Sequence, residues 1–151
     1  MLMRYLYTLL LLAVIVSCDL DSTLGSSQTD KCALQWAEAY FNYDFKRAAK
    51  LTTPESHKWL RFTASNITEE DLEVVRQQEQ PATVRLLTVD DVNDSIWQAL
   101  VEVSNLVMLD SIGHPATAYE EPKEFRVNVV CRNRRMFVKM DGVPQPQRMK
   151  R

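Results

Sequence analysis

The sequence predicts an α+β domain in which N-terminal helices pack on a curved antiparallel sheet of about four strands. Apolar residues recur at helical spacing from residue 30 to about residue 78. From residue 82 onward they alternate with polar residues, as strands with one buried face require. Turn signals join the alternating segments in series, and helices followed by strands in series are typical of the α+β class.

The helical part begins at residues 30–43, where apolar side chains form one stripe. The stripe consists of Ala33, Trp36, Ala37, Tyr40 and Phe41. Asp44 is a suitable N-cap for a second helix, and Thr53-Pro54-Glu55 is typical of the start of a third. Thr68 precedes three carboxylates, which favour the positive end of a fourth helix. This helix is expected to end at about Gln78, before a proline.

The strands are expected at residues 82–90, 96–109, 123–132 and 135–140. A long loop at 110–122, which contains glycine and two prolines, joins the second strand to the third. The side chains expected to face the helices are Val84, Leu86 and Thr88, then Trp97, Ala99, Val101 and Val103, and finally Phe125, Val127, Val129 and Cys131.

The first seventeen residues have the composition of a secretory signal peptide. Arg4 lies in a short basic region, and the segment 9–16 is entirely apolar. This run is too short to cross a bilayer as a helix, which needs about 20 apolar residues. We therefore expect residues 1–17 to direct export and to be removed.

The residues at the expected cleavage site, Ile15-Val16-Ser17-Cys18, resemble the bacterial lipobox. The resemblance implies diacylglycerol on the Cys18 sulfur, cleavage before Cys18 and acylation of the new amine. Two or more acyl chains hold a protein on a membrane far more firmly than one. An ordinary signal peptide followed by a chance cysteine is the alternative.

Residues 18–29 are expected to form the lipidated start and a flexible tether, because they are rich in Ser, Thr, Gly and Asp. Asp19 and Asp21 resemble sorting signals that some Gram-negative groups place after the lipidated cysteine. We expect anchoring in the bacterial cell envelope, in the outer membrane or at the cell surface rather than in the inner membrane. A single domain is then expected over residues 30–143.

The charge is distributed unevenly along the chain. Residues 123–151 hold nine Lys or Arg against two Asp or Glu, whereas residues 18–122 hold eight against eighteen. The basic end is either a patch for an anionic partner or lipid headgroups, or a set of strands that neutralises acidic neighbours; we favour neutralisation. Nucleic acid is not an expected partner of an exported chain. Residues 144–151 are expected to be a disordered basic tail.

Two cysteines remain besides Cys18. In an exported protein Cys32 and Cys131 either form a disulfide or remain as two buried thiols, and the sequence leaves both alternatives open. No spacing of cysteines and histidines predicts a metal site, and no motif predicts a cofactor or a catalytic nucleophile.

Residues 31–50 resemble the opening of NTF2-like, cystatin-like small domains. In those domains an amphipathic helix leads through an aromatic, Asp, aromatic step into a second helix, as in Tyr43-Asp44-Phe45 here. The closing Asp141-Gly142 also resembles the family, although Val143 and Pro144 stand where the family has a tryptophan, so the last strand is expected to be short. The resemblance implies a cone with a pocket at one end. Such fold-level likeness does not determine function.

For the function we expect a non-catalytic lipoprotein whose domain binds a small apolar ligand or an envelope protein. Trp36, Tyr40 and Trp97 are the candidate pocket residues, with core packing as their default role. The rival hypothesis is a pocket enzyme of the isomerase or dehydratase type that uses Tyr40 with Asp110. The third is a structural accessory subunit of a membrane complex, which an exposed apolar patch would favour.

Overall fold

The computed structural model describes the backbone of residues 19–109 and 114–148, and the side chains of these residues from Ser27 onward. The helices are α2 (Asp19–Phe41), α3 (Phe45–Lys50), the 3-10 turn η1 (Pro54–Ser56), α4 (His57–Ser65) and α5 (Glu69–Arg76). The strands are β1 (Thr83–Asn93), β2 (Ile96–Ser104), β3 (Val107–Met108), β4 (Thr117–Ala118), β5 (Lys123–Arg132) and β6 (Arg135–Lys139). The predicted α+β class is confirmed.

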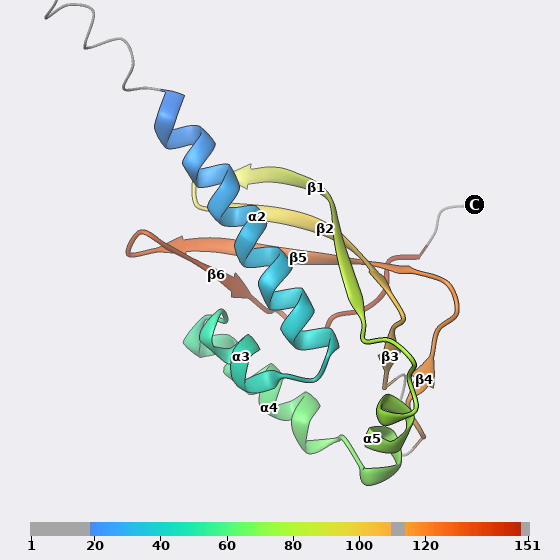
Figure 1. Cartoon of the computed structure of the whole chain (residues 1–151). Coiled ribbons are helices and arrows are strands. Elements are labelled where there is room, and N and C mark those ends of the chain that lie inside the picture. Colours follow the sequence, from blue (N-terminus) through green and yellow to red (C-terminus); the bar gives the residue numbers. More distant parts are fainter. Residues whose placement is uncertain (1–18, 110–113, 149–151) are drawn as a thin grey trace, which may run out of the picture.

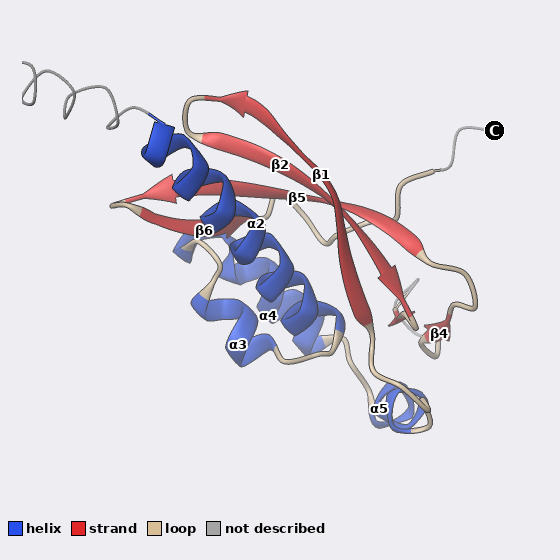
Figure 2. Cartoon of the chain, turned by 45° about the horizontal axis from the view of Figure 1, so that its top comes forward, coloured by secondary structure: helices blue, strands red, loops and turns tan. Residues whose placement is uncertain are grey.

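The main sheet is antiparallel and has the strand order β1-β2-β5-β6, and β3 and β4 form a separate two-stranded sheet. Figure 1 shows α2 running diagonally across the main sheet, and it contacts all four strands. Figure 2 shows α3 and α4 on the same side of the sheet as α2, while α5 and the small sheet lie toward its far end. The helices therefore cover one face of the main sheet.

Small side chains allow α2 to approach the sheet closely. Ala33 and Ala37 are fully buried on the helix, and Ala99 is fully buried on β2 below it. Phe41 packs on Phe125 of β5, with ring centroids 4.4 Å apart. The predicted inward faces of β2 and β5 are confirmed by the burial of Val101, Val103, Phe125, Val127 and Val129, but the prediction is wrong at Cys131, which is exposed near the end of β5. Burial of this apolar surface is the main favourable term in folding the domain.

Helix α2 begins at Asp19, well before residue 30, where the sequence predicts its start. The segment 19–29, which we expected to be a tether, is helical in its backbone. The helix ends in a Schellman motif, in which the Tyr43 N–H bonds to the Tyr40 carbonyl at 3.1 Å and the Asp44 N–H to the Ala39 carbonyl at 2.9 Å.

Two of the predicted helix caps are confirmed. The Asp44 side chain accepts from the Arg47 N–H at the start of α3. Thr68 forms a capping box with Asp71 at the start of α5, which satisfies two otherwise unpaired N–H groups. The third predicted start differs, because Thr53 precedes the turn η1 and makes no side-chain cap, so that α4 itself begins at His57.

A bulge changes the predicted face of β1. The register against β2 shifts between Leu86 and Thr88, so one extra residue is inserted. As a result Val89 packs against the core together with Val84 and Leu86, whereas Thr88 is exposed. The sequence pattern alone does not locate the bulge, because either register of Leu-Leu-Thr-Val places an apolar side chain on the core face.

The predicted strand 96–109 is wrong in its second half. Strand β2 ends at Ser104, and Asn105 has a φ of 54°, in the left-handed region that asparagine tolerates better than most residues. The chain turns there, and β3 pairs with β4 instead of continuing in the main sheet. This turn places Val107 and Met108 beside the helices.

The segment after the last strand also departs from the prediction. Strand β6 is short, as expected from the missing tryptophan. Residues 144–148, however, are not a free tail, because the Gln147 N–H donates to the Glu124 carbonyl oxygen at 2.8 Å. The chain therefore returns along β5 toward the end of the domain that holds β3.

Candidate functional site

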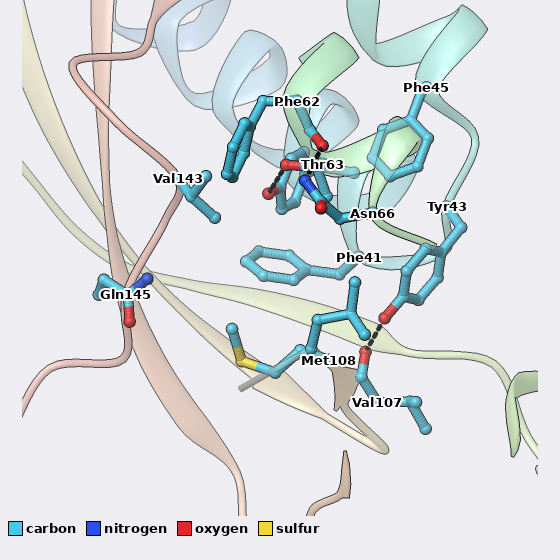
Figure 3. Close-up of a pocket in the computed structure, with 12 residues that line it drawn as sticks. Phe41, Tyr43, Phe45, Phe62, Thr63, Asn66, Val107, Met108, Val143 and Gln145 are labelled. Carbon is cyan, nitrogen blue, oxygen red and sulfur yellow. Dashed lines mark hydrogen bonds between the residues drawn. The ribbon is translucent and has the colours of Figure 1, made fainter. Parts of the chain in front are cut away.

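A cavity of about 220 Å³ lies at the C-terminal end of α2. It is enclosed by the start of α3, by α4, by β3 and by the chain that follows Gly142, as the close-up in Figure 3 shows. Its lining consists of Tyr40, Phe41, Tyr43, Phe45, Phe62, Thr63, Asn66, Val107, Met108, Leu109, Val143 and Gln145. The volume is somewhat below the roughly 300–1,000 Å³ of pockets that hold drug-sized ligands.

The wall is apolar and aromatic. Five of the lining side chains are aromatic rings, and none of the described lining residues is Lys, Arg, His, Asp or Glu. A charge brought into such surroundings would lose its hydration without gaining a partner, which is strongly unfavourable. The cavity therefore suits a neutral molecule, which would gain from contact with the rings.

Tyr43 occupies the wall in an unusual backbone conformation. Its φ is 62°, in the left-handed region, at a position where helices usually end in glycine. A side chain in this conformation costs about 1–2 kcal/mol, so the surrounding contacts must outweigh the strain. One such contact is the hydrogen bond from the Tyr43 hydroxyl to the Val107 carbonyl oxygen, which is 2.7 Å long and joins the helical layer to β3 (Figure 3).

Tyr40 and Thr63 form the polar part of the inner wall. The Tyr40 hydroxyl lies 3.3 Å from Thr63 Oγ1, and the Thr63 hydroxyl donates to the Trp59 carbonyl oxygen at 3.0 Å. Burial raises the pKa of Tyr40 to about 12, although its hydrogen bond to Thr63 acts in the opposite direction. Burial also raises the pKa of Tyr43, with further contributions from Tyr40 and Asp71. Both groups are therefore neutral phenols at physiological pH.

The mouth of the cavity is more exposed than its inner wall. Phe62 on α4 has 46 % of its surface exposed, whereas Phe41 and Tyr40 retain only 4 % and 7 %. Asn66 Nδ2 donates to the Phe62 carbonyl oxygen at 2.7 Å, and Figure 3 shows Val143 and Gln145 on the side of the cavity opposite Tyr43 and Phe45. The C-terminal segment thus forms one side of the entrance.

The structure brings only one of the three predicted pocket residues to this cavity. Tyr40 lines it, but Trp36 is buried in the core, where its Nε1 donates to Thr52 Oγ1 at 2.8 Å and its ring stacks on Tyr40. Trp97 lies near the hairpin end of β2, paired with Val129, and is not among the described residues that line the cavity. The three candidate residues therefore do not share this cavity, and Trp36 has the core-packing role that was its default.

The sequence did not predict that the other lining residues belong to a pocket. The aromatic step Tyr43-Asp44-Phe45 was the available signal, since both of its rings line the cavity. Val107 and Met108 were hidden because the sequence placed them in a continuous strand. Val143 and Gln145 were hidden because they were assigned to a disordered tail.

The rival pair of Tyr40 with Asp110 cannot be assembled here, since Asp110 lies outside the described residues. Of the two histidines, His57 is half-buried, and its Nε2 lies 3.0 Å from the Ala49 carbonyl oxygen and 3.2 Å from that of Thr52. His114 is exposed. Neither histidine lines the cavity.

Asp71 fastens the region beside the cavity. This residue is only 1 % exposed. Its carboxylate accepts three hydrogen bonds, from the Thr68 N–H at 2.7 Å, from the Thr68 hydroxyl at 2.8 Å and from the Ala116 N–H at 2.8 Å. Burial acts to raise the pKa of Asp71, but these hydrogen bonds outweigh it and hold the pKa below its usual value. The carboxylate thereby ties α5 to the segment that leads into β4.

The two cysteines of the domain are free thiols in the structure. Cys32 is buried on α2, whereas Cys131 is exposed near the end of β5, so the disulfide alternative does not hold. The alternative of two buried thiols holds for Cys32 alone. Burial raises the pKa of Cys32 to about 11, which makes it a poor nucleophile.

In the described part of the chain, no group of three or more His, Cys, Asp or Glu is placed to hold a metal ion. Across residues 19–109 and 114–148, no helix is both long enough and apolar enough to cross a membrane. Comparison with known proteins adds no further constraint, since neither a protein-family model nor a curated protein matches the chain.

Proposed function

We propose that this protein is a lipid-anchored lipoprotein of the bacterial cell envelope whose domain binds a small apolar ligand in the cavity at the end of α2. The observation that carries the proposal is the uncharged, largely aromatic lining of that cavity. Apolar cavities that small ligands fill are the usual form of a binding site in a small domain. The anchor is proposed on Ile15-Val16-Ser17-Cys18, which lie outside the described residues.

We also propose that the domain is a cone of the NTF2-like, cystatin-like type. The diagonal course of α2 over the sheet (Figure 1) supports this proposal, and so does the cavity at the end of that helix. The likeness bears on architecture only, since this type of fold carries many functions.

The third hypothesis, an accessory subunit that docks through the outer face of the sheet, lacks a supporting observation. Polar cross-strand pairs lie on that face, where Arg85 bonds to Glu102 at 2.9 Å and Gln98 bonds to Asn128 at 3.0 Å. Among the described residues, the large apolar side chains with substantial exposure are Phe62 and Val92. Phe62 lies at the mouth of the cavity and Val92 in the hairpin between β1 and β2.

The ligand is tested by native mass spectrometry of the full chain, extracted from its own host's membranes in polymer nanodiscs. We expect a small molecule to be retained. In Met108→Trp the larger side chain on β3 should fill the cavity and release the molecule. Val92→Trp is the matched control, because it adds the same ring at an exposed site (57 % exposed) away from the cavity.

Either of two results would contradict the ligand proposal. One is a wild-type protein that carries no small molecule, and the other is a molecule that Met108→Trp and Val92→Trp retain equally. A protein that co-purifies in place of a small molecule would instead favour the envelope-partner alternative.

The anchor is tested separately with Cys18→Ser. We expect the wild-type N-terminal peptide to begin at Cys18 and to carry the added mass of its acyl chains. The variant should lose these acyl chains and leave the membrane fraction. An unmodified Cys18 in the wild-type protein would overturn the lipoprotein assignment without affecting the cavity.

A further inference from the structure

The hydrogen bonds in the cavity wall determine where its hydroxyl protons point. A backbone carbonyl oxygen only accepts, so the single proton of Thr63 is taken by the Trp59 carbonyl oxygen, 3.0 Å away. In the contact between Tyr40 and Thr63, which is 3.3 Å long, Tyr40 must therefore be the donor. The proton of the Tyr40 hydroxyl points to α4. The free lone pairs of its oxygen remain available to accept a hydrogen bond.

The Tyr43 hydroxyl also uses its proton within the protein. Its hydroxyl proton is donated to the Val107 carbonyl oxygen at 2.7 Å, which also leaves an oxygen that only accepts. The two phenols of the cavity wall thus offer hydrogen-bond acceptors and no donors. Of the amide donors in the lining, Asn66 already donates to the Phe62 carbonyl oxygen at 2.7 Å, and Gln145 is exposed.

We propose that the cavity selects a small, neutral, apolar molecule that carries a hydrogen-bond donor, such as a hydroxyl group on one or two fused rings. Tyr40 and Tyr43 are the residues that accept from this donor. This inference rests on the proposed ligand-binding function and specifies the chemical class of its ligand. The modest volume of about 220 Å³ limits the size, and the uncharged lining disfavours an anion of the same shape.

The test compares three probes of nearly equal shape: 2-naphthol, its methyl ether and 2-naphthoate. Binding is measured by equilibrium dialysis against the full chain in phospholipid nanodiscs, and empty nanodiscs give the partition into lipid. We expect 2-naphthol to bind about fivefold more tightly than the ether, the difference that one net hydrogen bond makes. The carboxylate should bind more weakly than 2-naphthol, and Met108→Trp should abolish the binding of all three.

Thr63→Val should increase the affinity for the methyl ether. A misfolded variant would lose affinity, so misfolding could not produce this result. Valine has nearly the shape of threonine but accepts no hydrogen bond, so the Tyr40 proton is released toward the cavity. The methyl ether, which only accepts, should then bind about fivefold more tightly than it binds to the wild-type protein. The affinity for 2-naphthol should remain about the same.

The outcomes separate the two proposals. If neither 2-naphthol nor its ether binds beyond the lipid control, the proposed ligand-binding function fails and this inference fails with it. If the ether binds as tightly as 2-naphthol while Met108→Trp still abolishes both, the cavity is a ligand site but the preference for a donor is wrong. Tightest binding of the carboxylate would overturn the neutral ligand class.

Discussion

The Tyr43 hydroxyl donates a 2.7 Å hydrogen bond to the backbone carbonyl oxygen of Val107. This bond joins the end of α2 to β3, two regions that lie far apart in the sequence, and it crosses one wall of the cavity (Figure 3). Val107 is only 2 % exposed, so its carbonyl group has little access to water as a replacement partner.

Tyr43→Phe should therefore destabilise the domain. The variant keeps the ring but leaves a buried carbonyl oxygen without this partner, which costs about 1–3 kcal/mol. The free energy of unfolding, measured by urea denaturation, checks the prediction. Tyr43→Gly separates the two roles of the residue, since it relieves the left-handed backbone but removes both the ring and the bond. A fully stable Tyr43→Phe would show that the bond contributes nothing.

The stability of the domain should depend on pH through Asp71. The pKa of this carboxyl is lowered in the folded state, so its contribution is present above the usual value of 3.8 and is lost as the pH falls below it. The free energy of unfolding should decrease between about pH 5 and pH 3. Asp71→Asn should be less stable at pH 7 and should show a smaller decrease with pH. A variant with the same pH profile as the wild-type protein would contradict this role.

The two thiols of the domain should differ strongly in reactivity. Cys131 is exposed, whereas Cys32 is buried and its pKa is raised to about 11. Iodoacetamide at pH 8 should therefore alkylate Cys131 in the folded protein and Cys32 only after unfolding. Mass spectrometry of the peptides, without reductant, checks both sites. A pair of cysteines that remains unmodified until a reductant is added would instead reveal a disulfide.

The turn between β5 and β6 offers a stabilising substitution. Asn133 and Arg134 have φ values of 51° and 61°, as both central residues of a type I′ turn require. Glycine adopts this conformation without the steric cost that Arg134 incurs, so Arg134→Gly should stabilise the domain by about 0.5–1 kcal/mol. Thermal unfolding measures the change. Met136→Gly is the control, because it places glycine within β6 and should destabilise the domain instead.

Much of the fold follows from local signals along the chain. The caps at Asp44 and Thr68 and the limits of β5 depend on interactions within a few residues, and all three were predicted correctly. The same holds for the inward faces of β2 and β5, apart from the exposed Cys131, because alternation of apolar and polar residues is itself a local pattern. By itself, therefore, the sequence determined the class of the fold and the order of its helices and of the four strands of the main sheet, but not the small sheet of β3 and β4.

The position and the lining of the cavity were decided by the tertiary structure. The turn at Asn105 and the return of the chain at Gln147 bring Val107 and Gln145 to the end of α2, and neither follows from periodicity. Tertiary packing also assigned Trp36 to the core and left Cys32 and Cys131 unbonded. The physical reason is that a cavity is the space left between elements, and the distances between elements depend on contacts remote in sequence.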